Sequence, residues 1–169
     1  MERLDQSTKR NWGNWDNRNE KLIYILIELI KDVINKEKYI KQKEFISHGK
    51  TNLYEHQIFV AYECYKYLKK KKIMDIDMIY AALLHDYYLY DWHNRKKYPR
   101  KRLHGFRHPK IAALNAFNDY KISKKCMSMI KSHMFPLTLL HFPKSKLAFV
   151  LARLDKKVTI IEMKRKNYD

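Results

Sequence analysis

Histidine and aspartate side chains stand among apolar neighbours at five separate places along the chain. In order they are His56, the pair His85-Asp86, His108, His133 and Asp155. Burying an imidazole or a carboxylate without a partner costs on the order of 1–3 kcal/mol. A divalent metal ion removes that cost, because neutral imidazole and carboxylate oxygens are its ligands. The set therefore predicts a buried metal site.

A single histidine is a weak indication of such a site. Most lone histidines are satisfied core or surface residues, and His48, His93 and His141 are expected to be of that kind. Chance is a poorer explanation for the whole set. Four of the eight histidines, together with two aspartates, would have to fall by accident at the ends or inner faces of predicted helices.

The order of these residues follows the pattern H…HD…H…H…D, with gaps of 29, 22, 25 and 22 residues. This order resembles the HD-domain metal-dependent phosphohydrolase superfamily. Local phrases are similar to those of small stand-alone bacterial HD proteins, and the resemblance covers residues 48–160. The phrases are His48-Gly49-Lys50-Thr51, Leu83-Leu84-His85-Asp86, Leu89-Tyr90-Asp91-Trp92-His93 and His104-Gly105-Phe106-Arg107-His108-Pro109.

The resemblance implies a role for each residue. The metal site shared by nearly all HD domains would be formed by His56, His85, Asp86 and Asp155. Asp86 would also bridge to a second metal held by His108 and His133. The implied cofactors are one or two divalent ions, of Fe, Mn, Mg, Co or Ni, with His85 and Asp86 as the catalytic residues. A metal-activated water would then hydrolyse a phosphomonoester or phosphodiester, such as a nucleotide.

Basic and aromatic residues near these positions are candidates for substrate contacts. The expected substrate-binding residues, which flank the ligands in sequence, are Lys50, His104, Arg107 and Lys156. Lys110 is better explained as a solvated helix residue. The aromatic cluster consists of Tyr87, Tyr88, Tyr90 and Trp92, for which core packing is favoured over a wall that stacks on a base. The basic segment 95–102 could be a lid, a nucleic-acid contact or a solvated loop.

The net charge of +18, from 36 Lys and Arg against 18 Asp and Glu, favours anionic partners. Phosphates, nucleotides, nucleic acid and acidic membrane surfaces are all attracted by such a field, although a lysine-rich composition alone could also produce it. Two other functions stay open. An HD-fold di-iron oxygenase would use the same ligands, and a basic nucleic-acid-binding helical module would carry only a vestigial site.

Apolar residues recur at three- and four-residue spacings, which is typical of amphipathic helices. The predicted helices cover residues 22–34, 53–68, 78–87, 109–117, 124–133 and 144–161. No alternating strand pattern of useful length is present. We therefore expect an all-α protein, with one compact HD-type domain of about six or more helices over residues 20–169, after a polar N-terminal segment over residues 1–19.

Capping residues support several of these helix boundaries. Asn52 with Glu55 three residues later matches a capping box, Asp75 or Asp77 can open the next helix, and Ser123 can open another. Pro109 suits a first helical position, with His108 as the cap. Pro136 is expected to stop the helix that precedes it, and the last helix should start after Pro143.

Cysteine content and hydropathy bear on the compartment. Cys64 and Cys126 cannot form a disulfide scaffold and neither belongs to a CxxC motif, which favours a reducing setting. The longest apolar run, Leu22 to Ile30, contains Glu28 and is much shorter than the roughly 20 residues of a membrane span. We therefore expect a cytoplasmic protein without a membrane partner, and the oligomeric state stays open.

Overall fold

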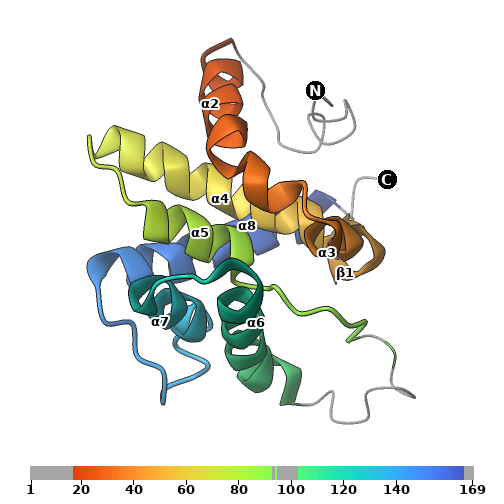
Figure 1. Ribbon diagram of the computed structural model, residues 1–169. Coiled ribbons are helices and arrows are strands. Elements are labelled where there is room, and N and C mark those ends of the chain that lie inside the picture. Colours follow the sequence, from red (N-terminus) through yellow and green to blue (C-terminus); the bar gives the residue numbers. More distant parts are fainter. Residues whose placement is uncertain (1–16, 93, 95–102, 166–169) are drawn as a thin grey trace.

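The computed structural model describes residues 17–92, 94 and 103–165, and within them the chain is helical with one short hairpin (Figure 1). The elements are α2 (Asn17–Ile34), α3 (Glu37–Ile40), the 3-10 helix η1 (Lys41–Glu44), β1 (Ile46–His48), β2 (Thr51–Asn52), α4 (Leu53–Lys70), α5 (Ile76–Leu84), α6 (His104–Tyr120), α7 (Lys124–Ser132) and α8 (Lys146–Arg165). These seven α-helices of the described part confirm the expected all-α fold. The N-terminal segment 1–16 and the basic segment 95–102 lie outside the described residues.

Helix α4 packs against α2, α5 and α8, while α7 packs against α5, α6 and α8 (Figure 1). Because α4 has neighbours on several sides, even its polar Gln57 is fully buried, together with Ile58 and Val60. Helix α2 presents only one face to this core, through Leu26 and Ile30. Each such fully buried side chain contributes roughly 1.5–3 kcal/mol by leaving water, so the core holds the helices that carry the polar candidates.

Three of the predicted helix caps are present in the structure. The Asn52 side chain accepts a hydrogen bond from the Glu55 amide at 2.9 Å. Asp75, one of the two candidates for its helix, accepts from Met78 at 3.0 Å, and Ser123 accepts from the Cys126 amide at 3.0 Å. These bonds satisfy amides that have no partner within the first turn of a helix. They confirm the predicted starts of α4 and α7, and place that of α5 at Ile76.

Several predicted boundaries are wrong. Helix α6 begins at His104, so Pro109 lies inside the helix and His108 is not its cap. Pro109 is the sixth residue of the helix, past the first turn, so its missing amide removes one intrahelical bond. Helix α5 ends at Leu84 rather than near residue 87. Helix α7 ends at Ser132, four residues before Pro136, so the proline does not itself stop the helix.

The antiparallel hairpin of β1 and β2 was not predicted from the sequence. Ile46 pairs with Asn52 and His48 pairs with Thr51, while Gly49 adopts a positive φ of 59° in the turn. Strands of three and two residues are too short to produce a recognisable alternation of polar and apolar residues. The hairpin places the His48 ring 5.2 Å from the ring of His56.

Glu63 links α4 to α8 and provides a first testable prediction. Lys66 and Lys157 each donate a hydrogen bond to its carboxylate at 2.8 Å. Burial alone raises the pKa of Glu63, but the bonds from Lys157 and Lys66 outweigh burial and lower the pKa. We expect Glu63→Gln to lower the free energy of unfolding at pH 7 by about 1 kcal/mol, measured by urea denaturation.

This contribution depends on pH in a defined direction. Because the folded-state pKa of Glu63 lies below the unfolded value, the stabilisation is present above the unfolded pKa and disappears as the pH falls through the folded pKa. Glu28→Gln is the control, since Glu28 forms a solvent-exposed pair with Lys31 and should change stability little. An equal loss of unfolding free energy in Glu63→Gln and Glu28→Gln at pH 7 would show that the bonds of Glu63 to Lys66 and Lys157 do not stabilise the fold.

No helix in the described ranges combines the length and the apolar composition that crossing a membrane requires.

Candidate metal centre

Five helices bring the six predicted ligand residues to one buried place. The residues are His56 in α4, His85 and Asp86 at the end of α5, His108 in α6, His133 at the end of α7 and Asp155 in α8. All six are buried, with at most 7 % of any residue exposed. Because each comes from a helix packed into the common core, the fold holds them together without a local sequence motif.

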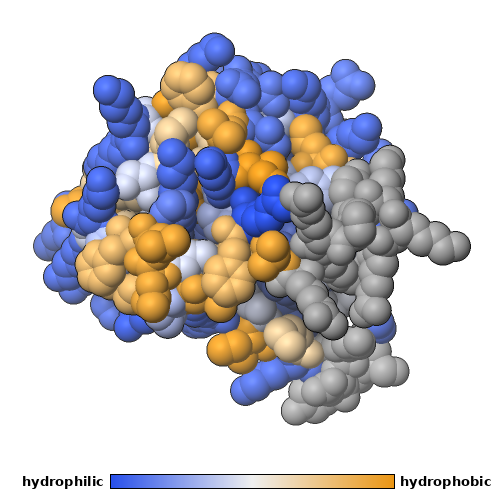
Figure 2. All heavy atoms as spheres, turned by 90° about the horizontal axis from the view of Figure 1, so that it is seen from below, coloured by the Kyte–Doolittle hydropathy of each residue, from blue (hydrophilic) through white to orange (hydrophobic). Residues whose placement is uncertain are grey.

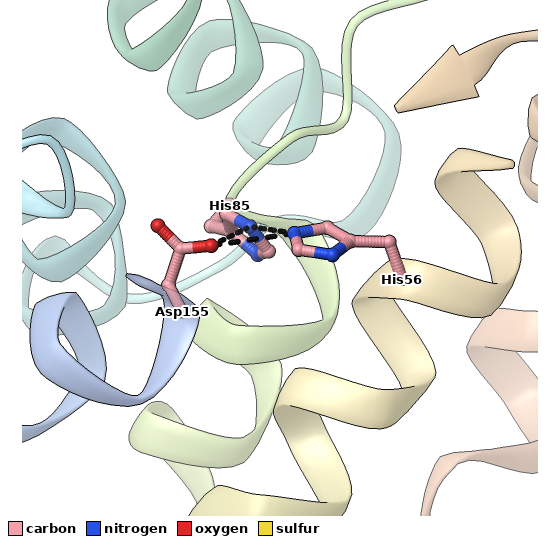
Figure 3. A group of neighbouring side chains, drawn as sticks. All are labelled: His56, His85 and Asp155. Atoms are coloured by element: carbon pink, nitrogen blue, oxygen red, sulfur yellow. Dashed lines mark hydrogen bonds and ion pairs between the residues drawn. The ribbon is translucent and has the colours of Figure 1, made fainter. Parts of the chain in front are cut away.

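A first group consists of His56, His85 and Asp155 (Figure 3). The Nε2 atoms of His56 and His85 are 3.2 Å apart, and they lie 3.3 and 3.4 Å from Asp155 Oδ1. A metal bound at about 2.0–2.2 Å, with ligand angles of roughly 90–110°, separates its ligand atoms by roughly 3.0–3.5 Å. The three atoms are therefore spaced so that they could hold one metal ion.

A second group lies on the other side of Asp86. The Nε2 atoms of His108 and His133 are 3.0 Å apart, and they lie 3.1 and 3.5 Å from Asp86 Oδ1. The second oxygen of this carboxylate, Oδ2, is 3.6 Å from the Nε2 atom of His85. Asp86 thus directs Oδ2 towards His85 and Oδ1 towards His108 and His133. The ligand atoms of His85, Asp86 and His133 are also close enough together to hold an ion.

The histidines are oriented by hydrogen bonds on the opposite side of each ring. The Nδ1 atom of each ring lies 2.7–2.9 Å from an acceptor, the pairs being His56 with Glu162 Oε2, His85 with the Ala82 carbonyl, His108 with the His104 carbonyl and His133 with the Ile130 carbonyl. Carbonyls and an ionised carboxylate can only accept, so each Nδ1 carries the proton. Nε2 is then the nitrogen of each ring that faces the centre, where it could bind a metal once any proton on it is released.

One carboxylate oxygen supports the same interpretation. Asp86 Oδ1 is buried, with the Nε2 atoms of His108 and His133 at 3.1 and 3.5 Å. Burial alone would raise the pKa of Asp86, but the rings of His85 and His108 outweigh it and hold the pKa well below its usual range. A buried carboxylate among imidazole nitrogens offers the oxygen and nitrogen ligands that divalent metals take, and the arrangement therefore fits a metal ion.

The surroundings of His133 and His56 shift their pKa values in opposite directions. Burial and the neighbouring rings of His85 and His108 lower the pKa of His133 to about 3, so His133 is neutral at ordinary pH. Burial also acts to lower the pKa of His56, but the carboxylates of Glu162 and Asp155 raise it well above its ordinary value. The negative charge that attracts a proton to His56 would attract a metal cation in the same way.

A cavity of about 510 Å³ opens beside the two groups. Its lining includes Asp86, His108, His133 and Asp155, together with His48, Tyr88 and Trp92. Trp92 stacks on His104, with ring centroids 4.9 Å apart and an angle of 5° between the planes. This volume lies in the range of small-molecule binding sites, so the candidate ligands border a space that a substrate could enter.

The expected substrate-binding residues separate into two pairs. His104 and Lys156 line the cavity, and the Lys156 ammonium donates to the carbonyls of His133 and Ala152 at 3.3 and 3.1 Å. Lys50 and Arg107 are exposed and do not belong to the lining of this cavity. The structure therefore brings two of the four expected substrate-binding residues to the candidate centre.

The aromatic cluster is also divided. Tyr87 is fully buried and donates a hydrogen bond to Asp119 at 3.0 Å, as expected for core packing. Tyr88 is buried but borders the cavity, and Trp92 lines it as well. His93 lies outside the described residues. Core packing is thus correct for Tyr87, whereas Tyr88 and Trp92 form part of the wall.

The chain was compared with known proteins and folds. No protein-family model, curated protein or solved structure matches it significantly. The candidate centre is therefore argued from its own side chains. They converge from five helices, are buried, and direct nitrogen and oxygen atoms to common points.

Glu162 is a residue of this centre that the sequence interpretation missed. It is buried on α8, and its Oε2 atom lies 2.8 Å from His56 Nδ1. The available signal is its position seven residues after Asp155, because two helical turns place both side chains on one face. Carboxylates that bond the far nitrogen of a ligand histidine orient its ring.

We expect Glu162→Ala to weaken metal binding by roughly 10- to 100-fold, because His56 loses the acceptor that orients it. Glu162→Gln keeps an oxygen acceptor for Nδ1 and should retain most of the affinity. Calorimetric titration of the metal-free protein with Mn²⁺ measures both variants. Equal affinity of Glu162→Ala and the unmodified chain would show that His56 needs no such support.

Proposed function

We propose that the chain is a metal-dependent phosphohydrolase of the HD type, which binds two divalent ions and hydrolyses a nucleotide or a similar phosphate ester. One observation carries the proposal. The two oxygens of Asp86 face different groups of imidazole nitrogens, at 3.6 Å from His85 and at 3.1 Å from His108. A carboxylate in this position can be shared by two ions, as the two-metal sites of phosphatases and nucleases require.

The ligand residues have defined tasks in this proposal. One ion would be held by His56, His85, Asp86 and Asp155, and the other by Asp86, His108 and His133. Such ions supply Lewis-acid activation of water and of the phosphoryl oxygens. The chain contributes the fixed orientation of each imidazole, through the protons held on Nδ1. It also keeps the ligand atoms away from bulk water, which strengthens their electrostatic interactions.

The cavity indicates where the rest of a substrate would bind. Tyr88 and the Trp92–His104 stack provide flat surfaces along one wall, which suit a base or another ring. Lys156 lies on the lining, half-buried beside Asp155, and provides a positive charge near the phosphate. The net charge of +18 favours an anionic substrate. The proposal uses Lys156 and His104 for substrate contact and does not depend on Lys50 or Arg107.

The alternatives differ in what they would require. A nucleic-acid-binding module with a vestigial site has no need for six buried ligand residues whose acceptor atoms face one another. A di-iron oxygenase would use the same ligands, so its distinguishing property is the reaction with oxygen. The basic character of the chain favours hydrolysis of a phosphate ester over oxygenation.

The test is hydrolysis by protein that has been stripped of metal and then reloaded with Mn²⁺ or Fe²⁺. We expect release of nitrophenol from p-nitrophenyl phosphate or bis-p-nitrophenyl phosphate, reversed by a chelator. His133→Ala should lose this activity, whereas His141→Ala, which removes a histidine outside the centre, should keep it. Oxygen uptake without phosphate release would favour the oxygenase, and no metal-dependent turnover of any ester would contradict the proposal.

A further inference from the structure

The connection between α7 and α8 exposes an unusual amount of apolar surface. Leu140 is 97 % exposed and Leu139 is 72 % exposed, and Leu137 and Phe142 in the same short segment are also exposed. Scattered exposed leucines are normal in proteins, but a contiguous apolar patch marks an interaction surface. Figure 2 shows apolar side chains gathered on the corresponding side of the molecule, between hydrophilic ones.

A basic cleft lies directly beside this patch. It has a volume of about 540 Å³ and is formed by one face of α7 and by residues 140–144. Three lysines line it, Lys124, Lys131 and Lys144, and no carboxylate does. Lys125, also on α7, pairs with Asp75 at the start of α5. None of the three cleft lysines forms an ion pair with a described residue. The cleft therefore concentrates positive charge that is not neutralised by the described part of the protein.

The patch and the cleft form one continuous surface. Leu140 and Phe142 belong to both, since they line the cleft and are exposed beyond it. We call this surface the apolar-basic face and define it by Leu137, Leu139, Leu140, Phe142, Lys124, Lys131 and Lys144. It adjoins the cavity beside the candidate metal centre. Gly105 lines that cavity, and a Cβ atom added to Gly105 would lie 3.0 Å from the side chain of Leu137.

We propose that the apolar-basic face docks onto the surface of an anionic lipid bilayer. The lysines of the cleft would receive lipid phosphate groups, while Leu139, Leu140 and Phe142 would enter the boundary between headgroups and acyl chains. Proteins that adsorb to membranes combine these two attractions, apolar burial and basic charge near anionic lipids. This is adsorption to one leaflet, and it requires no membrane-spanning helix.

Two other occupants fit the face less well. Nucleic acid would be attracted to the lysines and Phe142 could stack on one base, but Leu139 and Leu140, the most exposed side chains of the face, offer no ring for stacking. A second copy of this chain, joined through the same face on both partners, would bring the three lysines of each copy together. Like charges in close contact oppose such pairing, whereas an anionic membrane complements both the charge and the apolar tip.

The test is co-sedimentation of the full chain with vesicles of phosphatidylglycerol and phosphatidylcholine in equal parts, compared with phosphatidylcholine alone. We expect binding to the anionic vesicles only. The double variant Leu139→Ser/Leu140→Ser should bind them at least about tenfold more weakly, since two apolar side chains no longer enter the interface. Lys131→Gln/Lys144→Gln should weaken binding by about fivefold for each lysine.

Matched controls separate a specific face from general attraction by net charge. Ile73→Ser/Met74→Ser removes two exposed apolar residues from another surface, and Lys69→Gln/Lys70→Gln removes two exposed lysines there. If these controls weaken binding as much as the face variants, the proposal is overturned. It is also overturned if Leu139→Ser/Leu140→Ser converts a dimer of the chain into a monomer without weakening vesicle binding. The same holds if the face variants weaken binding of single-stranded RNA but not binding of anionic vesicles. None of these measurements needs a loaded metal centre.

Discussion

Asp86→Asn is expected to reduce metal-dependent ester hydrolysis by roughly a thousandfold or more, the loss that follows when several kcal/mol of transition-state stabilisation by metals disappear. The asparagine has nearly the same shape, so the change removes one negative charge and one ligand oxygen. Because the two oxygens of Asp86 face different groups of histidines, one of the two proposed ions would lose its Asp86 ligand and the shared carboxylate would be lost. Steady-state hydrolysis and metal content of the variant measure the effect.

The control for this variant is its fold. Because His85 and His108 lower the pKa of Asp86 against the effect of burial, losing its charge should lower the Tm of the metal-free protein somewhat, so activity is compared at a temperature where helical circular dichroism shows both proteins folded. Lys110→Ala, at an exposed position on α6, should keep full activity. Normal hydrolysis by correctly folded Asp86→Asn would exclude a bridging role.

Metal loading is expected to raise the Tm by roughly 10 °C. An ion present at about a thousand times its dissociation constant stabilises the folded state by about 4 kcal/mol. For a chain of this length, each kcal/mol shifts the Tm by roughly 2–4 °C. Differential scanning calorimetry with and without Mn²⁺ measures the shift, and His56→Ala should lose most of it because a ligand of the first group is absent.

The size of this shift should depend on pH. The carboxylates of Glu162 and Asp155 raise the pKa of the buried His56, against the effect of burial. In the metal-free protein, a raised pKa stabilises the fold below the ordinary histidine value and this stabilisation disappears as the pH rises through the folded-state pKa. Protons also compete with metal for the same ring. The metal-induced shift should therefore grow between pH 6 and pH 8, and a shift that shrinks with rising pH would contradict the site.

The predicted ligands could be found from sequence because metal chemistry restricts residue types. His56 and Asp155 are 99 positions apart in the chain, yet each has an apolar residue one helical turn away, Val60 after His56 and Leu151 before Asp155. Burial of such a residue needs an explanation, and a common metal site explains all of them together. Helix caps such as Ser123 were also predictable, since capping is a local property of sequence.

The remaining parts depend on contacts that sequence neighbours do not determine. Arg107 precedes His108 in sequence, but successive residues of a helix point about 100° apart, so Arg107 is exposed while His108 is buried. Glu162 is one acidic residue on a charged helix, and only the packing of α8 against α4 shows that it reaches His56. The early start of α6 escaped prediction because Pro109 is typical of a helix start and not of its second turn.

The central claim is that two buried groups of ligands hold two metal ions with Asp86 between them. Elemental analysis of protein purified without a chelator tests this claim most directly, with His108→Ala measured in parallel. We predict about two Fe or Mn ions per chain, falling toward one in His108→Ala because only the second group loses a ligand. One ion in both proteins would contradict the binuclear centre, and no ion in either after reconstitution would contradict a metal site altogether.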